Sequence, residues 1–341
     1  LQTECGKETL NTKTTFIIEG WIKKTDLLGL QKKLAGTDAY AIPVLAAKGE
    51  TPPVALQNKK IFKPFETITN LYGMPARGEI DPTPVLAPFF LIFFAICLTD
   101  AGYGLTLAGL AYLGLKKLKV GETGKLLLKL MVVLGLGTIV IGLLTGGIFG
   151  IDFSHLGNHW EWAKAVRAKI MLLDPIKNPM AFLLVALGLG FIQIWFGIFL
   201  HMLENFKMNR FADGILDQVP LLAITLGLLL FSLTTAGYIP KGWKTPSIAA
   251  VYTGMLTLIL FQGRASKNIF ARIFIGFYGL YGIIGLVGDL LSYSRLLALG
   301  LATGILAMVV NIIGGLVLKI PLVGPVFMLA VLVAGHLFVI A

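Results

Sequence analysis

The sequence predicts an all-α polytopic membrane protein with about eight transmembrane helices, preceded by a small α+β lobe. Three observations lead to this fold class. Of the 341 residues, 56% are hydrophobic and 14% are charged, whereas a soluble domain carries about 25% charged residues. The apolar residues form long runs, and short basic segments separate these runs. One run contains an arginine, Arg295, which marks it as a candidate functional segment.

The net charge of +11 does not indicate a nucleic-acid-binding face. Most basic residues lie between apolar runs, where they anchor loops and are attracted to anionic lipids. Cys5 and Cys97 are far apart, and Cys97 lies within an apolar run, so we predict no disulfide framework. The chain begins with leucine and shows no signal peptide, so we expect a fragment.

Residues 1–60 form the soluble-looking part and resemble a piece of an α+β lobe. The pattern predicts strands at Phe16–Ile22 and Tyr40–Leu45, with a short helix at Asp26–Leu34 between them. Such a segment is too small to bury a convincing core alone. Residues 61–84 follow as an interfacial lead-in that is rich in turn-forming residues.

The transmembrane ion-translocating domain is expected at residues 85–341. Its first apolar run, Val85–Leu115, would be about 46 Å long as one helix, too long for a hydrocarbon core of about 30 Å. We therefore predict two short helices broken at Asp100, and a re-entrant hairpin fits equally well. The later runs bring the total to eight segments: Lys129–Gly150, Pro179–Leu203, Ile215–Tyr238, Ser247–Gln262, Arg272–Leu318 and Pro321–Ala341. With a cytoplasmic N-terminus and a paired first run, the inside loops hold more lysine and arginine than the outside loops, as the positive-inside rule requires.

The run Arg272–Leu318 is anomalous in length and charge. Unbroken, it would extend about 70 Å, so it must be steeply tilted, kinked or partly outside the bilayer. Arg295 cannot be neutralised by deprotonation, and a guanidinium in hydrocarbon costs about 2.5–17 kcal/mol. An interaction with a partner must offset this cost.

Helical periodicity places Arg295 on a face that carries no acidic residue. This face consists of Gly288, Leu291, Ala298, Leu299, Ala302 and Leu306, with Ser292 at its edge. Asp289 lies about 120° away around the helix. Small residues allow another backbone to approach closely, so we interpret Arg295 as facing a partner that supplies a carboxylate. The alternative is an arginine that snorkels to the surface or pairs with an acid on a neighbouring helix of this chain.

Other polar residues at membrane depth are candidates for an ion path to Arg295, or for interhelical hydrogen bonds and end caps. They are Asp100, Gln193, His201, Asp289, Thr303, Asn311 and His336, with Glu204 and Asn205 at a helix end.

Three further motifs are rejected. His155 and His159 lie beside Asp152 and Glu161, but no third strong ligand is fixed by spacing, so we expect a solvated loop and no metal. The segment Gly121–Lys125 departs from a phosphate-binding loop at both ends, so we predict no nucleotide and no cofactor. The pair Asp100 and Asp289 raises an intramembrane aspartyl protease, whose signature requires glycine at position 286, which is leucine here.

Several motifs together resemble the membrane stator of rotary ATPases, subunit a of the V type, called subunit I in archaea and bacteria. They are PFE, LYG and DPTP within Pro64–Pro84, DAGYG at Asp100–Gly104, and SYSRLLALGLA at Ser292–Ala302. The resemblance covers nearly the whole chain. Thr99 stands where many members have glycine.

The resemblance implies a non-catalytic subunit of a bacterial or archaeal membrane that couples H⁺ or Na⁺ translocation to rotation. Its last two helices would be long and tilted along a ring of rotor proteolipid subunits that bear ion-binding carboxylates, and a cytoplasmic arm would reach peripheral stalk subunits. Arg295 matches the essential arginine of the seventh helix. Asp100, Ser292 and Thr303 fall in or near family motifs, whereas Asp289, Gln193, His201, Glu204 and His336 rest on their chemistry.

The chain departs from the family at both ends. Members usually continue past a segment like Ala334–Ala341 to a second arginine, and their cytoplasmic arm is longer. One alternative function is a self-contained secondary transporter that binds an anion at Arg295, but only one broken run is found, without the counterpart that internal repeats would supply. A purely structural anchor leaves Arg295 unexplained.

Overall fold

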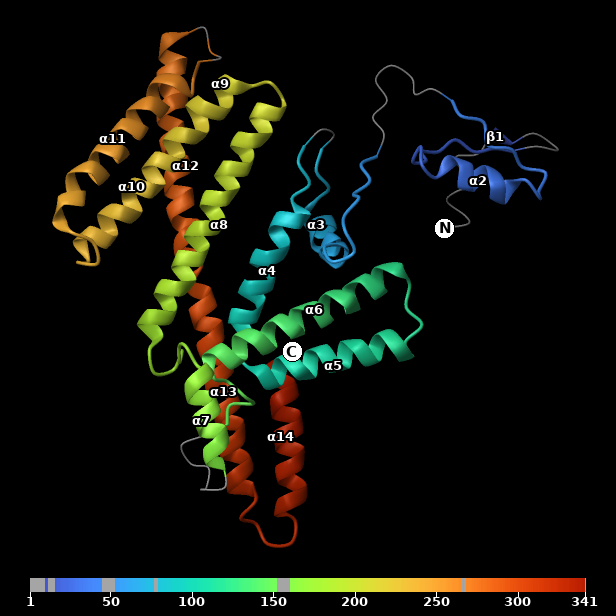
Figure 1. Ribbon diagram of the computed structural model, residues 1–341, viewed down its shortest axis with the longest axis vertical. Coiled ribbons are helices and arrows are strands. Elements are labelled where there is room, and N and C mark those ends of the chain that lie inside the picture. The colour runs from blue at the N-terminus through green and yellow to red at the C-terminus, as the bar shows by residue number, and fades with distance from the viewer. Residues whose placement is uncertain are drawn as a thin grey trace. The chain divides into compact units, whose positions relative to one another are not determined.

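The computed structural model describes residues 10–11, 16–44, 53–76, 79–151, 160–264, 266 and 268–340. The chain divides into two compact units, Leu1–Gln57 and Asn58–Ala341. Figure 1 shows the ribbon of both units, and each is described by itself.

The N-terminal unit contains little regular structure among its described residues. Strand β1 (Leu10–Asn11) pairs antiparallel with β2 (Phe16–Ile17), and helix α2 (Leu27–Leu34) follows. The predicted helix is confirmed. The strand predicted at Phe16–Ile22 is only two residues long, and the described part of the second predicted strand, 40–44, is not a strand. The α+β lobe is therefore not confirmed, because exposed side chains such as Trp21 and Ile22 have no core to pack into.

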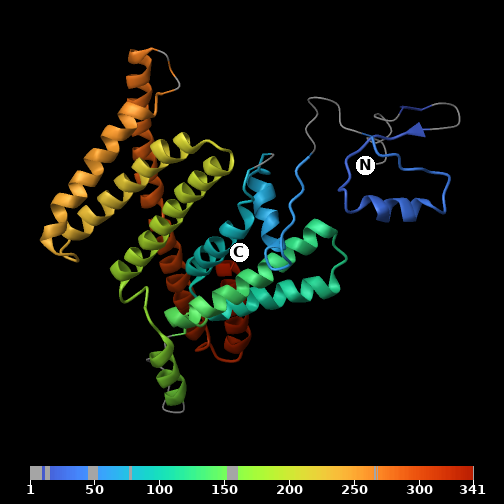
Figure 2. The ribbon, with the colours of Figure 1, turned by 45° about the horizontal axis from the view of Figure 1, so that its top comes forward.

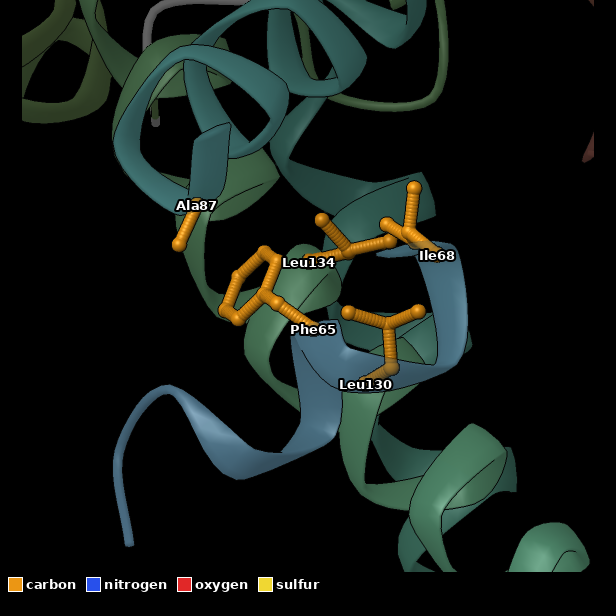
Figure 3. Packing of buried hydrophobic residues seen from close by; sticks show 5 residues of the cluster. All are labelled: Phe65, Ile68, Ala87, Leu130 and Leu134. Carbon is orange, nitrogen blue, oxygen red and sulfur yellow. The ribbon is translucent and has the colours of Figure 1, made fainter. Parts of the chain in front are cut away.

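The second unit begins with a lead-in that packs onto the helices. The lead-in comprises η1 (Lys63–Phe65) and α3 (Glu66–Tyr72). Side chains of this lead-in interlock with those of α4 (Thr83–Leu98) and α6 (Glu122–Thr145), as Figure 3 shows for the cluster of Phe65, Ile68, Ala87, Leu130 and Leu134. The lead-in is therefore fixed to the helical part of the unit.

The predicted break at Asp100 is confirmed. Helices α4 and α5 (Ala101–Lys117) are bent by 119° relative to each other, which is the geometry of a broken span or a re-entrant loop. Thr99 has φ 45°, in the left-handed region that a β-branched residue rarely adopts. Asp100 is extended and caps α5. The bend lets α5 run beside α6, as both views show.

Two consecutive sets of helices follow along the chain. The first comprises α7 (Glu161–Ile170), α8 (Pro179–Lys207), α9 (Phe211–Asp213), the π-helix η4 (Gly214–Gln218), α10 (Val219–Thr235), η5 (Lys241–Trp243) and α11 (Lys244–Phe261). The second comprises α12 (Ile269–Ser292), α13 (Ser294–Val317) and α14 (Gly324–Ile340). Figures 1 and 2 show α10 beside α11, and α13 beside α14.

The number of membrane spans is smaller than predicted. All eight apolar runs contain helix. Within the described residues, however, five helices are long and apolar enough to span a membrane, or up to six if the bent α4–α5 pair is one span. The prediction of eight transmembrane helices is not confirmed, because the α4–α5 pair counts as at most one span and α14, with 17 described residues, is a shorter apolar helix. The predicted long run is borne out as one 48-residue stretch, Phe270–Val317.

Gly142 allows the bend to pack against α6. A Cβ atom at this position would collide with the backbone of Asp100 and Ala101. Gly142→Ala is expected to destabilise the protein by about 1–3 kcal/mol through overpacking. Gly109→Ala on α5 is the matched control, because open space surrounds that glycine, and it is expected to be neutral or stabilising by up to about 1 kcal/mol. Thermal unfolding of the solubilised protein measures both, and equal melting temperatures would contradict the packing.

Asp81 gives the lead-in a pH-dependent contribution to stability. Burial raises the pKa of Asp81, but hydrogen bonds from Thr83 and Asn58 outweigh it, so the pKa lies below its ordinary value. The carboxylate therefore stabilises the fold above the unfolded-state pKa, and this contribution disappears as the pH falls through the folded-state pKa. We expect Asp81→Asn to lower the melting temperature at pH 7 and to match wild type at the acidic end. A pH-independent difference would contradict this.

Candidate functional site

Arg295 lies on an exposed face of the α12–α13 stretch. It is in the first turn of α13, directly after the turn residue Tyr293 that separates the two helices. Among the described residues, the Arg295 guanidinium forms neither a hydrogen bond nor an ion pair, so no acid of the described chain neutralises it. The surrounding face is also exposed and consists of Gly288, Leu291, Ala298, Leu299, Ala302 and Leu306, with Ser292 at its edge.

The opposite face of α13 is buried against the protein. Leu296 packs with Ile96, Phe182 and Ala186 from α4 and α8. Further along, Ala307 is fully buried and Gly314 contacts α14. One side of α13 is thus held by its neighbours, and the side that carries Arg295 is left open.

Tyr293, two residues before Arg295, anchors the start of α13 to α8. Its hydroxyl donates a hydrogen bond to Gln193 Oε1 of α8 at 2.5 Å. Its ring centroid lies 5.3 Å from that of Phe93, and a Cβ atom at Gly190 would collide with the ring. Sequence reasoning selected Gln193 but missed Tyr293. A tyrosine inside an apolar run was the available signal, because a buried phenol usually has a hydrogen-bond partner.

The break between α4 and α5 contacts α13 through two threonines. Thr303 Oγ1 lies 3.2 Å from the Cys97 carbonyl oxygen and 3.3 Å from that of Leu98. Thr99 Oγ1 donates to the Gly300 carbonyl at 3.1 Å. The Cys97 and Leu98 carbonyls, at the end of α4, lack partners within their own helix. The sequence candidate Thr303 therefore lies at this helix contact.

Asp100 is a buried cap whose side chain accepts four backbone hydrogen bonds. Oδ1 accepts from the amides of Gly102 at 2.8 Å, Tyr103 at 3.1 Å and Phe149 at 2.8 Å. Oδ2 accepts from the Gly150 amide at 3.0 Å. The side chain thus joins the start of α5 to the segment after α6. Of the two interpretations that the sequence left open for Asp100, the geometry matches the end cap.

A second polar cluster connects α5, α13 and α14. The fully buried Tyr103 hydroxyl lies 2.8 Å from His336 Nδ1, and His336 Nε2 lies 3.2 Å from Asn311 Oδ1. Asn311 Nδ2 donates to the Phe149 carbonyl at 2.7 Å. His336 and Asn311 were candidates from the sequence. Tyr103 was missed as a polar partner, and no sequence spacing brings residues 103 and 336 together.

The other sequence candidates are not joined to these clusters. His201 and Asp289 are exposed, Glu204 Oε1 lies 3.3 Å from the amide nitrogen of Ile80, and Ser292 donates to the Asp289 carbonyl at 2.7 Å. In the described part of the chain, none of these side chains bonds to Arg295. No group of three or more potential metal ligands occurs among the described residues. His155, His159 and Asp152 lie outside them.

A charge cluster outside the predicted site joins the α11–α12 loop to the helical segment before α10. Arg264 forms a bidentate pair with Asp217 at 2.7 and 2.9 Å and also bonds to Asp213. The hydrogen bonds to Asp217 and Asp213 raise the pKa of Arg264 above its ordinary value, although burial lowers it. The cluster fixes the α11–α12 loop to α9 and η4, which precede α10. Sequence position alone places Arg264 among the basic residues of the inside loops and does not predict its two acidic partners.

Comparisons with known proteins point to one family. The profile of the V-type ATPase 116kDa subunit family matches residues 7–273. The chain is 32% identical to the A-type ATP synthase subunit I of Methanocaldococcus jannaschii, over 96% of this chain and 50% of that protein. It is 31% identical to that of Thermococcus kodakarensis, over 96% and 49%. It is 25% identical to the V-type ATP synthase subunit I of Chlamydia pneumoniae, over 91% and 54%.

The apolar helices define the class of this chain as a polytopic integral membrane protein of all-α architecture. Within that class it belongs to the V-type ATPase 116kDa subunit family, and its similarity to A-type and V-type ATP synthase subunits I supports a place among them. The profile match ends before Arg295, so the assignment does not depend on that residue. The chain spans about half the length of the curated relatives it matches.

The Tyr293–Gln193 hydrogen bond provides a direct test of the site geometry. Tyr293→Phe removes the donor, and we expect destabilisation by about 0.6 kcal/mol, the average for hydrogen bonds between membrane helices, and by no more than about 1.7 kcal/mol. Tyr278→Phe on α12 is the control, because that side chain is 71% exposed and its melting temperature should not change. Thermal unfolding of the two solubilised variants measures the difference. Equal shifts would show that the bond does not hold α13 to α8.

Proposed function

We propose that the chain is the stator subunit of the membrane sector of a rotary ATPase. In this role it forms ion half-channels against a rotor ring and couples H⁺ or Na⁺ movement to rotation, with ATP synthesis or hydrolysis on other subunits. The observation that carries the proposal is the exposed, apolar face around Arg295, on a helix whose other face is packed. Its family membership supports the same role.

The charge of Arg295 requires a partner when this face is covered. A guanidinium stays ionised, and its desolvation in hydrocarbon costs about 2.5–17 kcal/mol. The partner that fits is a rotor ring of proteolipid subunits with carboxylates at membrane depth. Arg295 would stabilise each arriving carboxylate in its ionised form and block direct leakage between the half-channels. Lysine is a poorer choice, because a desolvated ammonium readily loses its proton.

The polar residues around Arg295 supply candidates for the two half-channels. Gln193 of α8 bonds to Tyr293, at the junction of α12 and α13. His336 of α14 bonds to Tyr103 of α5. Ser292, Asp289 and Thr303 lie along the same α12–α13 stretch. His201 and Glu204 lie on α8. Asp100 is the least suited of these candidates to carry an ion, because backbone amides occupy both of its oxygens.

The remaining assignments follow from the same proposal. The chain itself binds no nucleotide and performs no catalysis. Its N-terminus lies in the cytoplasm of a bacterial or archaeal cell and continues an arm that contacts peripheral stalk subunits. Loop charges support this orientation. Arg264 is paired with Asp213 and Asp217. Its charge therefore contributes less to this orientation than a count of the basic loop residues assumes.

Substitution of Arg295 in the intact complex tests the role directly. In membrane vesicles, we expect Arg295→Ala to reduce ATP-driven ion uptake at least about 100-fold, because a desolvated carboxylate without its cation costs about 3–5 kcal/mol. We expect Arg295→Lys to abolish coupled uptake as well. Arg272→Lys is the control, because Arg272 lies near the start of α12, away from Arg295, and donates to the Leu260 carbonyl of α11. Ion uptake should persist in this variant.

Assembly of the complex must be checked by pull-down for every variant. Uptake that persists with Arg295→Lys in an intact complex would show that position 295 needs only a positive charge. Undiminished uptake with Arg295→Ala would refute the stator role of this residue. Anion exchange by the isolated subunit would favour a self-contained transporter instead.

A further inference from the structure

We propose that Asp100 is the positioning residue for Arg295 and carries no translocated ion. This inference rests on the proposed function of Arg295. The Asp100 cap holds the α4–α5 break in the conformation against which α13 packs. The contact between the break and α13 then sets the membrane depth and the helix rotation at which Arg295 meets its partner. This inference reverses the sequence-based placement of Asp100 in the ion path.

The first step is the bonding of the carboxylate itself. Asp100 is 3% exposed, and its four accepted hydrogen bonds come from backbone amides of two chain segments. A protonated carboxyl group would place a donor against an amide donor at Gly150. Loading an ion there would therefore require at least one of these bonds to break, and a buried amide left unpaired is costly in a membrane.

The second step is what the break exposes. Because α4 stops at Leu98, the carbonyls of Cys97, Leu98 and Thr99 project without helical partners. Thr303 Oγ1 of α13 lies 3.2 and 3.3 Å from the first two, and it shares its one hydrogen with the Gly300 and Leu299 carbonyls of its own helix at 3.0 and 3.1 Å. Thr145 Oγ1, at the end of α6, donates to the Thr99 carbonyl at 2.9 Å. A continuous α4–α5 helix would satisfy these carbonyls internally and leave α13 without its polar contact.

The third step is the fit of α13 against the break. A Cβ atom at Gly300 would lie 2.9 Å from the Ile96 carbonyl oxygen, and one at Gly150 would lie 2.5 Å from Ala307 Cβ. With Thr303, the contacts recur at residues 300, 303 and 307, which is one face over two helical turns. They therefore fix both the rotation and the height of α13. Arg295 lies about 140° around the helix from Gly300, so the same contact directs it to the open side.

A pair of substitutions separates positioning from ion transfer. Asp100→Asn keeps an oxygen that can accept three of the four bonds but cannot exchange a proton. Asp100→Glu keeps the titratable carboxyl group but is one methylene too long for the cap. If Asp100 positions, ATP-driven uptake by the intact complex should stay within about fivefold of wild type for Asp100→Asn. For Asp100→Glu it should fall about 100-fold, because small misplacements of a reacting group have effects of that size.

A cross-linking readout reports the position of α13 independently of transport. Leu299→Cys, with Cys5 and Cys97 replaced by alanine, is cross-linked to single cysteines along the rotor subunit. The cross-linking pattern should be retained with Asp100→Asn and shifted or lost with Asp100→Glu. Both variants could lose transport. In that case, a cross-linking pattern unchanged from that of the protein with native Asp100 overturns the proposal, and a pattern shifted in both variants supports it. Transport that survives Asp100→Glu and vanishes with Asp100→Asn also overturns it.

Thr303→Val acts on the other side of the same contact. It preserves volume and removes the hydroxyl that reaches Cys97 and Leu98, so we expect the same direction of cross-link shift. Thr253→Val on α11 is the control, because its hydroxyl bonds only within its own helix. If Leu299→Cys never cross-links to the rotor in the otherwise native complex, the proposed function fails. If it cross-links identically in every variant, only the positioning inference fails.

Discussion

The constraint on which this fold depends is the satisfaction of backbone polar groups at a bend inside an apolar run. A chain that turns by 119° between α4 and α5 exposes amides on one side and carbonyls on the other, and a membrane supplies no water to solvate them. Asp100 accepts from the amides, and threonines of α6 and α13 donate to the carbonyls. The bend between α4 and α5 is therefore a junction at which α6 and α13 also meet, and it holds α13 in place.

Arg295 differs from the other polar groups at membrane depth. Most of the hydroxyl groups there donate to carbonyls one turn earlier in their own helix, as Thr138, Thr225 and Thr234 do. Buried amides and imidazoles pair across helices, as Gln193 and His336 do. The Arg295 guanidinium has no such partner among the described residues. Under the proposed function, the partner of this permanently charged group comes from a second molecule.

Sequence reasoning could reach the features that local chemistry decides. The break at Asp100 followed from the length of an apolar run, and the acid-free face around Arg295 followed from helical periodicity. It could not reach contacts between distant segments, such as Tyr103 with His336 or Arg264 with Asp217. It also overestimated the strands of the first unit, because strand propensity is realised only where a sheet or core is available to pack against. The count of eight spans is not confirmed, because apolar composition does not determine how much of a run is a full-length helix.

The glycines of α12 show how one sequence pattern can serve two surfaces. Gly276 and Gly279 lie against Ile259 of α11 and Gln262 at its C-terminal end, where a Cβ atom would collide. Gly282, Gly285 and Gly288 have open space around them instead. The spacing of three, slightly short of a helical turn of 3.6 residues, rotates successive glycines by about 60° around the helix. The series thus starts on the face packed against α11 and ends on the open face just before Arg295, where close approach by another backbone remains possible. Internal packing accounts for the first two glycines, and an approaching rotor helix, under the proposed function, would account for the last three.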